Sequence, residues 1–502
     1  MIATVAGILF AVRWPFRESA IIQDLEEAGS GKVEIRNFRQ TYFPHPGCIA
    51  EGVTYRLGAN APPFATFEKL TIQSNLLGLL GSHIRRIRAD GLHVYVPPKG
   101  SKQFNGLNSA STQIDEINIY NAILDVPRRE AGKPAVQFGI YELILEPASA
   151  TRAMHFSARL SNPEPPGEIV AAGSFGPWLG VKTPVTGDYT LENANLGAFR
   201  GISGILSSQG TFSGILQHIN VAGKINIPGF EVTNSEHPVA LNSEFSAYVD
   251  GINGDTFLNQ VSSEFLKTTV ASSGKIAATP GRKGKTATID LEARNGRIED
   301  ILRMFTKEAR PPMAGEVSFK GKAVLPPGTA RFLRKIEMAG DFGISDSNFT
   351  RPSTQEKVNQ LSQNAQTELR EHAKSTGGKK EIAPQTPPPV LSDLRGHVAL
   401  KNGTATFSNL SFYIPGAHAK MHGTYNLISD KIDMHGTLKM DSDLSDTAHG
   451  AKALILKVLD PFFKKKRGAG SDIPVKVSGD YHHPSFGMDV QKAGKRLLSG
   501  GK

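Results

Sequence analysis

Residues 391–440 read LSDLRGHVALKNGTATFSNLSFYIPGAHAKMHGTYNLISDKIDMHGTLKM, and this stretch decides the fold class. Apolar and polar residues alternate in short runs, and Asn402-Gly403 separates two of these runs. Successive side chains of a strand point to opposite faces, and Asn-Gly between alternating runs is a strong hairpin signal. The stretch therefore predicts antiparallel strands with one apolar face and one polar face.

The rest of the chain has the composition of the same kind of protein. Of its 502 residues 39% are hydrophobic, and it contains 51 glycines and 31 prolines. So many turn formers between short alternating runs are typical of an all-β protein. Two short helices are also predicted, one capped by Ser19 and one over residues 298–305, where apolar residues recur at helical spacing.

Composition divides the chain into five parts. They are an apolar helix and membrane anchor (1–16), an N-terminal and central β region (17–350), a helical and Pro-rich excursion (351–390), a C-terminal β region with an amphipathic helix at 451–466 (391–490), and a flexible tail (491–502).

The first of these parts is open to two interpretations. Residues 1–12 are apolar, but twelve helical residues span only about 18 Å, against about 30 Å for a bilayer core. They form either a buried helix or a membrane anchor, which is itself short or is the end of a longer one. Trp14 suits a membrane interface, whereas Arg13 and Arg17 disfavour export of the chain beyond them, since positive charge favours the cytoplasmic side.

Positive charge also marks the end of the amphipathic helix. The formal net charge of the chain is +10, and a run of basic residues comes after two phenylalanines beyond position 461. Such a helix either docks on an anionic membrane or closes one end of a groove. Nucleic acid is not an expected partner, because no basic strand carries interleaved stacking aromatics. The membrane-surface candidates are Phe462, Phe463, Lys464, Lys465, Lys466 and Arg467.

Catalytic chemistry is not indicated. The single cysteine, Cys48, cannot form an internal disulfide. No nucleophile elbow, phosphate loop or zinc-protease helix occurs in the sequence. His418 and His422 fall on one strand face, but Lys420 lies between them and disfavours a cation there. We therefore expect no enzymatic activity, no catalytic residues, no metal and no cofactor.

The predicted sheet has more apolar surface than the few predicted helices can cover. Exposed apolar area is unfavourable by about 25 cal/mol per Å². The sheet therefore either folds on itself as a sandwich or curls around an apolar ligand. We expect the second: a mostly β fold, in which a long, strongly twisted antiparallel meander curls into an elongated groove, with a few short peripheral helices and an N-terminal apolar helix. The lipid-groove candidates, which would form the core of the alternative sandwich, are Val398, Leu400, Phe407, Phe412, Met421, Met434 and Met440.

Several short motifs, in order along the chain, resemble the AsmA-like proteins of the bacterial envelope. They are Val33-Glu34-Ile35, Leu76-Leu77-Gly78-Leu79-Leu80, Leu160-Ser161-Asn162-Pro163, Leu394-Arg395-Gly396, Ile414-Pro415-Gly416-Ala417, Gly423-Thr424-Tyr425 and Val477-Ser478-Gly479. The resemblance implies an inner-membrane tether at the N-terminus, a periplasmic body, and a β-groove like that of bridge-type lipid-transfer proteins.

These patterns are compatible with three functions. The first is the binding and transport of phospholipid or another acyl lipid between membranes in support of outer-membrane biogenesis, with an envelope or outer-membrane protein as a further partner. The second is a non-enzymatic scaffold or assembly factor for outer-membrane proteins. The third is an envelope polysaccharide enzyme, which would need clustered carboxylates on one strand face.

Overall fold

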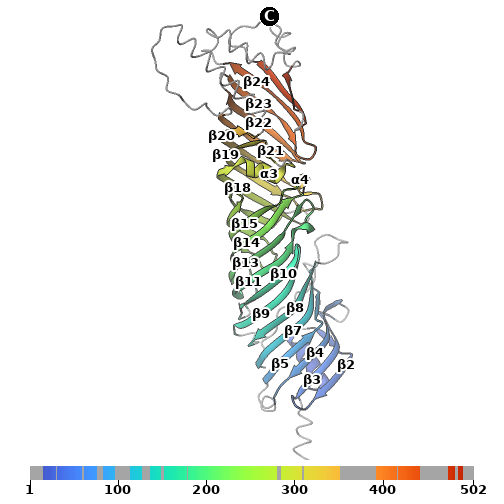
Figure 1. The fold of residues 1–502 in the computed structure, drawn as a ribbon. Coiled ribbons are helices and arrows are strands. Elements are labelled where there is room, and N and C mark those ends of the chain that lie inside the picture. The colour runs from blue at the N-terminus through green and yellow to red at the C-terminus, as the bar shows by residue number, and fades with distance from the viewer. Residues whose placement is uncertain are drawn as a thin grey trace, which may run out of the picture.

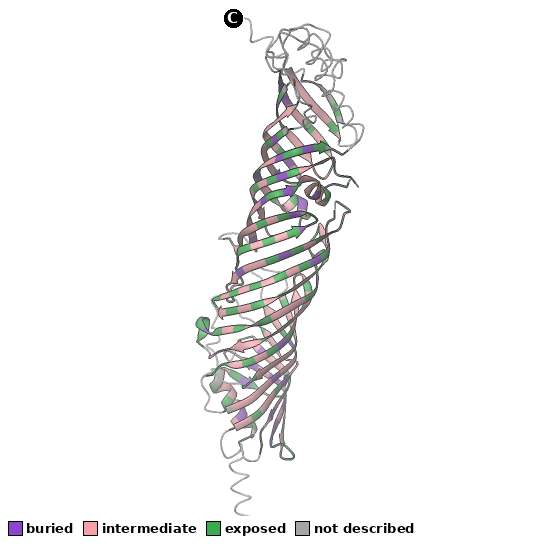
Figure 2. Cartoon of the chain, turned by 60° about the vertical axis from the view of Figure 1, so that its left-hand side comes forward, coloured by how far each residue is buried: buried purple, intermediate pink, exposed green. Residues whose placement is uncertain are grey.

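The structure is a computed structural model in which one β-sheet runs the length of the molecule. The described residues form 26 strands, all linked in this sheet. Figures 1 and 2 show a single layer that twists and curls about the long axis, with no second layer of described strands packed on it. The predicted mostly β class and the long twisted sheet are confirmed. The described residues are 15–29, 31–58, 61–75, 83–95, 113–126, 136–147, 152–177, 179–233, 235–279, 284–307, 310–350, 392–414, 417–440, 473–480 and 484–489.

Four predicted features lie wholly or mainly outside the described residues. They are the apolar helix at 1–16, the excursion at 351–390, the amphipathic helix at 451–466 and the tail at 491–502.

The N-terminal strands contain a departure from the predicted antiparallel meander. β5 and β6 pair in parallel with β7. Residues 96–112 separate β6 from β7, and this length satisfies the dozen or more residues that a parallel crossover needs. The strands of this part are β1 (Lys32–Glu34), β2 (Asn37–Thr41), β3 (Gly47–Arg56), β4 (Pro63–Gln73), β5 (His83–Asp90), β6 (His93–Tyr95), β7 (Gln113–Val126), β8 (Val136–Glu146) and β9 (Met154–Pro163).

From β7 onward every strand pairing among the described residues is antiparallel, and almost all join strands adjacent in sequence. Two short 3-10 helices, η2 (Gly180–Lys182) and η3 (Leu196–Ala198), lie in connections. The remaining strands are β10 (Pro166–Phe175), β11 (Pro184–Asn195), β12 (Ile202–Ser203), β13 (Ile205–Ile215), β14 (His218–Val232), β15 (Val239–Val249), β16 (Thr256–Phe265), β17 (Thr268–Ala278), β18 (Lys285–Arg297), β19 (Met313–Leu325), β20 (Glu337–Phe349), β21 (Ser392–Lys401), β22 (Thr404–Ile414), β23 (Ala417–Asn426), β24 (Lys431–Met440), β25 (Ile473–Asp480) and β26 (Pro484–Met488).

Helix α2 (Glu18–Gly29) covers the first strands and forms the largest core with them. Its Ile21 is buried in the same cluster as Leu70 and Ile72 of β4. Cys48 of β3 is 1% exposed there, and burial raises the pKa of its thiol to about 12. The prediction that Ser19 caps this helix is wrong. The helix is already under way at that residue, since the Ile21 N–H donates to the Arg17 carbonyl at 3.0 Å.

Helix α3 (Ile298–Phe305), which the sequence predicts, lies farther along on the same side of the sheet. Its Ile298 and Ile301 pack against a buried cluster of Val317, Ile344 and Leu394 from β19, β20 and β21. Its buried Asp300 accepts hydrogen bonds from the Lys267 N–H and the Thr268 hydroxyl, both at 2.9 Å, which ties the helix to the β16–β17 turn. A third helix, α4 (Phe332–Lys335), lies between β19 and β20.

Asparagines in the left-handed conformation interrupt the ladders without reversing the faces. Asn193, Asn295 and Asn409 have φ between 52° and 55°, and each lies where the register shifts by one residue. A β-bulge absorbs one extra residue in this way. Phe407 and Leu410 are therefore three positions apart and still pair with Gly423 and Met421 on one face. Asparagine tolerates this backbone conformation better than most residues do.

Replacement of Asn409 by valine tests this bulge. A β-branched residue is strained at positive φ, so we expect Asn409→Val to lower the free energy of unfolding by about 1–2 kcal/mol. Asn409→Gly, which accepts the same φ, should stay within about 0.5 kcal/mol of the original protein. Urea unfolding and amide hydrogen exchange in β22 measure both changes. Equal stability of the two variants would contradict the assigned role.

Candidate functional site

A continuous apolar face is the main feature of the sheet. Register carries it from strand to strand: Phe156 pairs with Gly173, Gly187 with Phe212, and Phe319 with Phe342. Most of its side chains are half-buried although they lie on a single-layered sheet. We call this surface the apolar face and define it by Phe156, Phe175, Phe212, Val221, Ala247, Leu258, Ile289, Phe319, Phe342, Val398, Phe407 and Met434.

The opposite face is charged, and its ion pairs run across neighbouring strands. Lys224 Nζ lies 2.8 Å from Glu244 Oε1, and Lys401 Nζ lies 2.9 Å from Glu337 Oε1. The hydrogen bond between Lys224 and Glu244 raises the pKa of the lysine and lowers that of the glutamate. Exposed pairs of this kind contribute little to stability. Their effect is to keep this face in water, so that the sheet is amphipathic over most of its length.

The seven lipid-groove candidates all hold register positions that belong to the apolar face. Val398 pairs with Phe407, which is followed along the register by Gly423 and Met434. Phe412 and Met421 lie on the same face in the pairing of β22 with β23, and Met440 holds the corresponding backbone position opposite Ala417. Leu400 is 5% exposed, whereas Val398, Phe407, Phe412, Met421 and Met434 are half-buried. The membrane-surface candidates at 462–467 lie outside the described residues.

Sequence reasoning missed the aromatic residues of the central strands, which lie over glycines. The ring centroids of Phe156 and Phe212 are 6.3 Å apart. These residues lie on β9 and β13, which flank Gly173 of β10 and Gly187 of β11. A Cβ added at Gly187 would meet the Phe212 ring at 2.8 Å, and one added at Gly340 would meet the Phe319 ring at the same distance. Glycine therefore lets these rings lie down on the sheet, and a glycine opposite an aromatic in neighbouring runs is the signal that could have found them.

Helices cover only two parts of the apolar face, one at its first strands and one around β19. Among the described residues, α2 packs on β3 to β5 and α3 on β18 to β22, which leaves the apolar side chains of β8 to β13 without a helix over them (Figures 1 and 2). Contiguous exposed apolar surface of more than a few hundred Å² usually marks a binding site. This uncovered part of the apolar face is the candidate functional site.

The charged face carries a hollow of its own. It has a volume of about 820 Å³ and extends over β11 and β13 to β17. Its lining is mainly polar and includes Glu192, Glu244 and Glu264. Glycosidase chemistry needs a carboxylic acid with a raised pKa, whereas the pKa of Glu244 is lowered by Lys224. Glu244 therefore does not have the raised pKa that the catalytic acid of a polysaccharide enzyme needs.

Histidines on the charged face pair with carboxylates. His435 Nδ1 lies 2.8 Å from Asp489, and its Nε2 lies 3.2 Å from Asp433. His418 and His422 lie on this face with Lys420 between them, as the alternation predicts. In the described part of the chain no three His, Cys, Asp or Glu side chains gather as metal ligands would. None of the described helices is both long and apolar enough to cross a membrane.

No protein-family model, curated protein or solved structure matches this chain. The residues and their geometry are therefore the basis for assigning a function.

Two neighbouring residues of β14, the strand that pairs with β13 next to the uncovered part, provide a test of the assignment of the two faces. Val221 is half-buried on the apolar face, and Ala222 is exposed on the charged face. We expect Val221→Lys to weaken binding of an environment-sensitive apolar dye about tenfold, since an ammonium group in an apolar site costs more than 1 kcal/mol. Ala222→Lys adds the same charge and should leave dye binding unchanged. Fluorescence titration of the full chain measures both, and equal effects would contradict the assignment of the faces.

Proposed function

We propose that the protein binds acyl chains of phospholipid along the apolar face and supports lipid movement between membranes and outer-membrane biogenesis. The observation that carries this proposal is the continuity of the apolar face over almost the whole sheet, together with its uncovered part. At about 4.8 Å per strand, more than twenty strands span roughly 100 Å. In this proposal the curled sheet forms an elongated groove around the bound acyl chains.

An acyl chain suits such a surface because it needs no directional partner. Burial of each methylene contributes roughly 0.8 kcal/mol, wherever along the face the chain lies. The half-buried phenylalanines and methionines have no strong hydrogen-bonding group. Hydroxyl groups that share the face bond to one another, as Tyr189 does with Ser208 at 3.1 Å and Ser243 with Ser263 at 2.8 Å. A lipid can therefore shift from strand to strand with little change in free energy, while its polar head stays in water.

The resemblance to AsmA-like envelope proteins is the basis for the cellular setting. We infer from it a periplasmic body tethered to the inner membrane through the N-terminal apolar residues. The basic end of the segment at 451–466 would then contact an anionic membrane surface. No direction of transport is implied, because the apolar face is of one character along its length.

A matched pair of variants in β23 tests transport. Met421 is half-buried on the apolar face, and the next residue, His422, is exposed on the charged face. We expect Met421→Asp to lower the rate of phospholipid transfer between donor and acceptor vesicles by about tenfold, because a carboxylate obstructs an apolar path. His422→Asp should transfer at the original rate. In addition, phospholipid should co-purify with the full chain prepared without detergent; its absence, with no transfer activity, would refute the proposal.

A scaffold for outer-membrane proteins is a second candidate, favoured by one observation. Within the described residues, β26 pairs with β25 and with no other strand, so one of its edges offers backbone groups to a partner strand. Partners that add a strand to a sheet edge use such groups.

Site-specific photo-crosslinking tests the scaffold. A crosslinker at Ser485 of β26 should trap nascent β-barrel proteins if this edge accepts a strand, and one at Asn220 in central β14 should not. Crosslinks to lipid alone from the apolar face, with none to protein from Ser485, would exclude this candidate.

A further inference from the structure

The curl of the sheet brings its two long edges together at one place. The loop between β11 and β13 lies at one edge, where Asn195 pairs with Ile205. The connection between β19 and β20, which contains α4, lies at the other edge. The Phe332 N–H of α4 nevertheless donates to the Arg200 carbonyl of that loop at 2.8 Å. We call this contact between opposite edges the seam.

Close packing around α4 shows that the seam is a fitted contact. A Cβ added at Gly201 would lie 2.8 Å from the Phe332 nitrogen, so only glycine allows the approach. On its other side α4 meets two turns of its own edge, the β21–β22 turn at Gly403 and the β23–β24 turn at Ile428. A cavity of about 30 Å³ lies between Gly201, Leu333 and Ile428. A cavity of this size holds about one water molecule.

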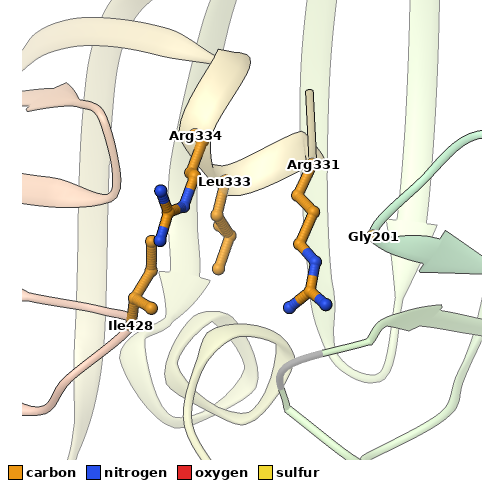
Figure 3. A pocket seen from close by; sticks show the side chains of 5 residues that line it. All are labelled: Gly201, Arg331, Leu333, Arg334 and Ile428. Atoms are coloured by element: carbon orange, nitrogen blue, oxygen red, sulfur yellow. The ribbon is translucent and has the colours of Figure 1, made fainter. Parts of the chain in front are cut away.

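Two arginines, Arg331 at the N-cap of α4 and Arg334 within the helix, extend beside this cavity. Figure 3 shows Leu333 pointing into the space between Gly201 and Ile428, with Arg331 and Arg334 on either side of it and extending in the same direction. Leu333 is 4% exposed, whereas both arginines are exposed. Cationic groups thus border a buried apolar side chain at the place where the edges of the sheet meet.

Neither of these arginines has a counter-charge among the described residues. Among the described residues no carboxylate lies within 4 Å of Arg331 or Arg334, whereas Lys224, Lys322 and Lys401 each have one. A guanidinium group presents a planar set of donors that matches a phosphate group. Two unpaired guanidinium groups beside an apolar residue fit a ligand that is anionic at one end and apolar at the other.

We propose that the seam binds the phosphate group of an anionic acyl lipid, with Arg331 and Arg334 as the phosphate ligands. The phosphate lies at the mouth of the cavity, since the cavity itself is too small for it. The acyl chains continue onto the apolar face, which passes α4 at the paired residues Met338 and Leu400. The proposal rests on the acyl-binding function above and adds to it a preferred headgroup and a fixed place for it.

Calorimetric titration of the full chain with three soluble probes tests the seam. The probes are dihexanoyl phosphatidic acid, dihexanoylglycerol and inorganic phosphate. We expect the original protein to bind the phosphatidic acid at least about fivefold more tightly than the neutral lipid, since only the phosphate group accepts charge-assisted hydrogen bonds from the two guanidinium groups. The charge reversal R331E/R334E should abolish this preference and leave binding of the neutral lipid unchanged.

Two further variants make the result specific to the seam. R39E/R152E reverses two exposed arginines that also lack an ion pair among the described residues, and it should keep the preference despite the same change in net charge. R331Q/R334Q removes the charge without reversing it and should also lose the preference. This variant keeps the proposal testable if R331E/R334E fails to fold.

Each other outcome contradicts a different statement. A preference that survives both α4 variants would overturn the seam as its source. Inorganic phosphate bound as tightly as the phosphatidic acid would identify a free-anion site and overturn the lipid assignment. Equal binding of the charged and neutral lipids would overturn the seam proposal alone, whereas failure of both lipids to bind would refute the acyl-binding function itself.

Discussion

The two-residue period of a strand is the constraint on which this molecule depends. A slip of one residue in any pairing would exchange the two faces of every strand beyond it. The register avoids this from β7 to β25, even where an extra residue enters. At Asn193, Asn295 and Asn409 a left-handed residue takes up the extra position, and the apolar side chains after it return to their face. The continuity of the apolar face is thus a property of the backbone pairing as much as of composition.

Local pattern was sufficient to predict what depends on neighbours in sequence. Alternation placed all seven candidates from Val398 to Met440 on one face, and helical spacing predicted α3. The bulges carry a weaker signal, because asparagine occurs in many kinds of turn. The glycines under Phe212 and Phe319 are a further signal in the sequence. They predict the position of the aromatic rings only once the pairing of neighbouring strands is known.

Other features depend on positions far apart and were not accessible to sequence. The parallel pairing of β5 with β7 is decided by the path of an intervening connection and leaves no trace in the period of either strand. The meeting of Arg200 with Phe332 depends on the accumulated curl of the strands between them. Neither the alternation nor the turn residues specify how far a sheet curls, because each hairpin satisfies its own hydrogen bonds at many values of twist.

The seam also sets a length. Elsewhere from β7 onward the sheet is assembled from hairpins that contact mainly their neighbours, as in repeat proteins, so a hairpin gained or lost would lengthen or shorten it by roughly 10 Å and preserve both faces. Between β13 and β19 this freedom is absent, because one more hairpin there would carry Phe332 past Arg200. The molecule therefore combines end regions, to which evolution can add hairpins, with a central section closed by the seam, in which the number of strands is fixed.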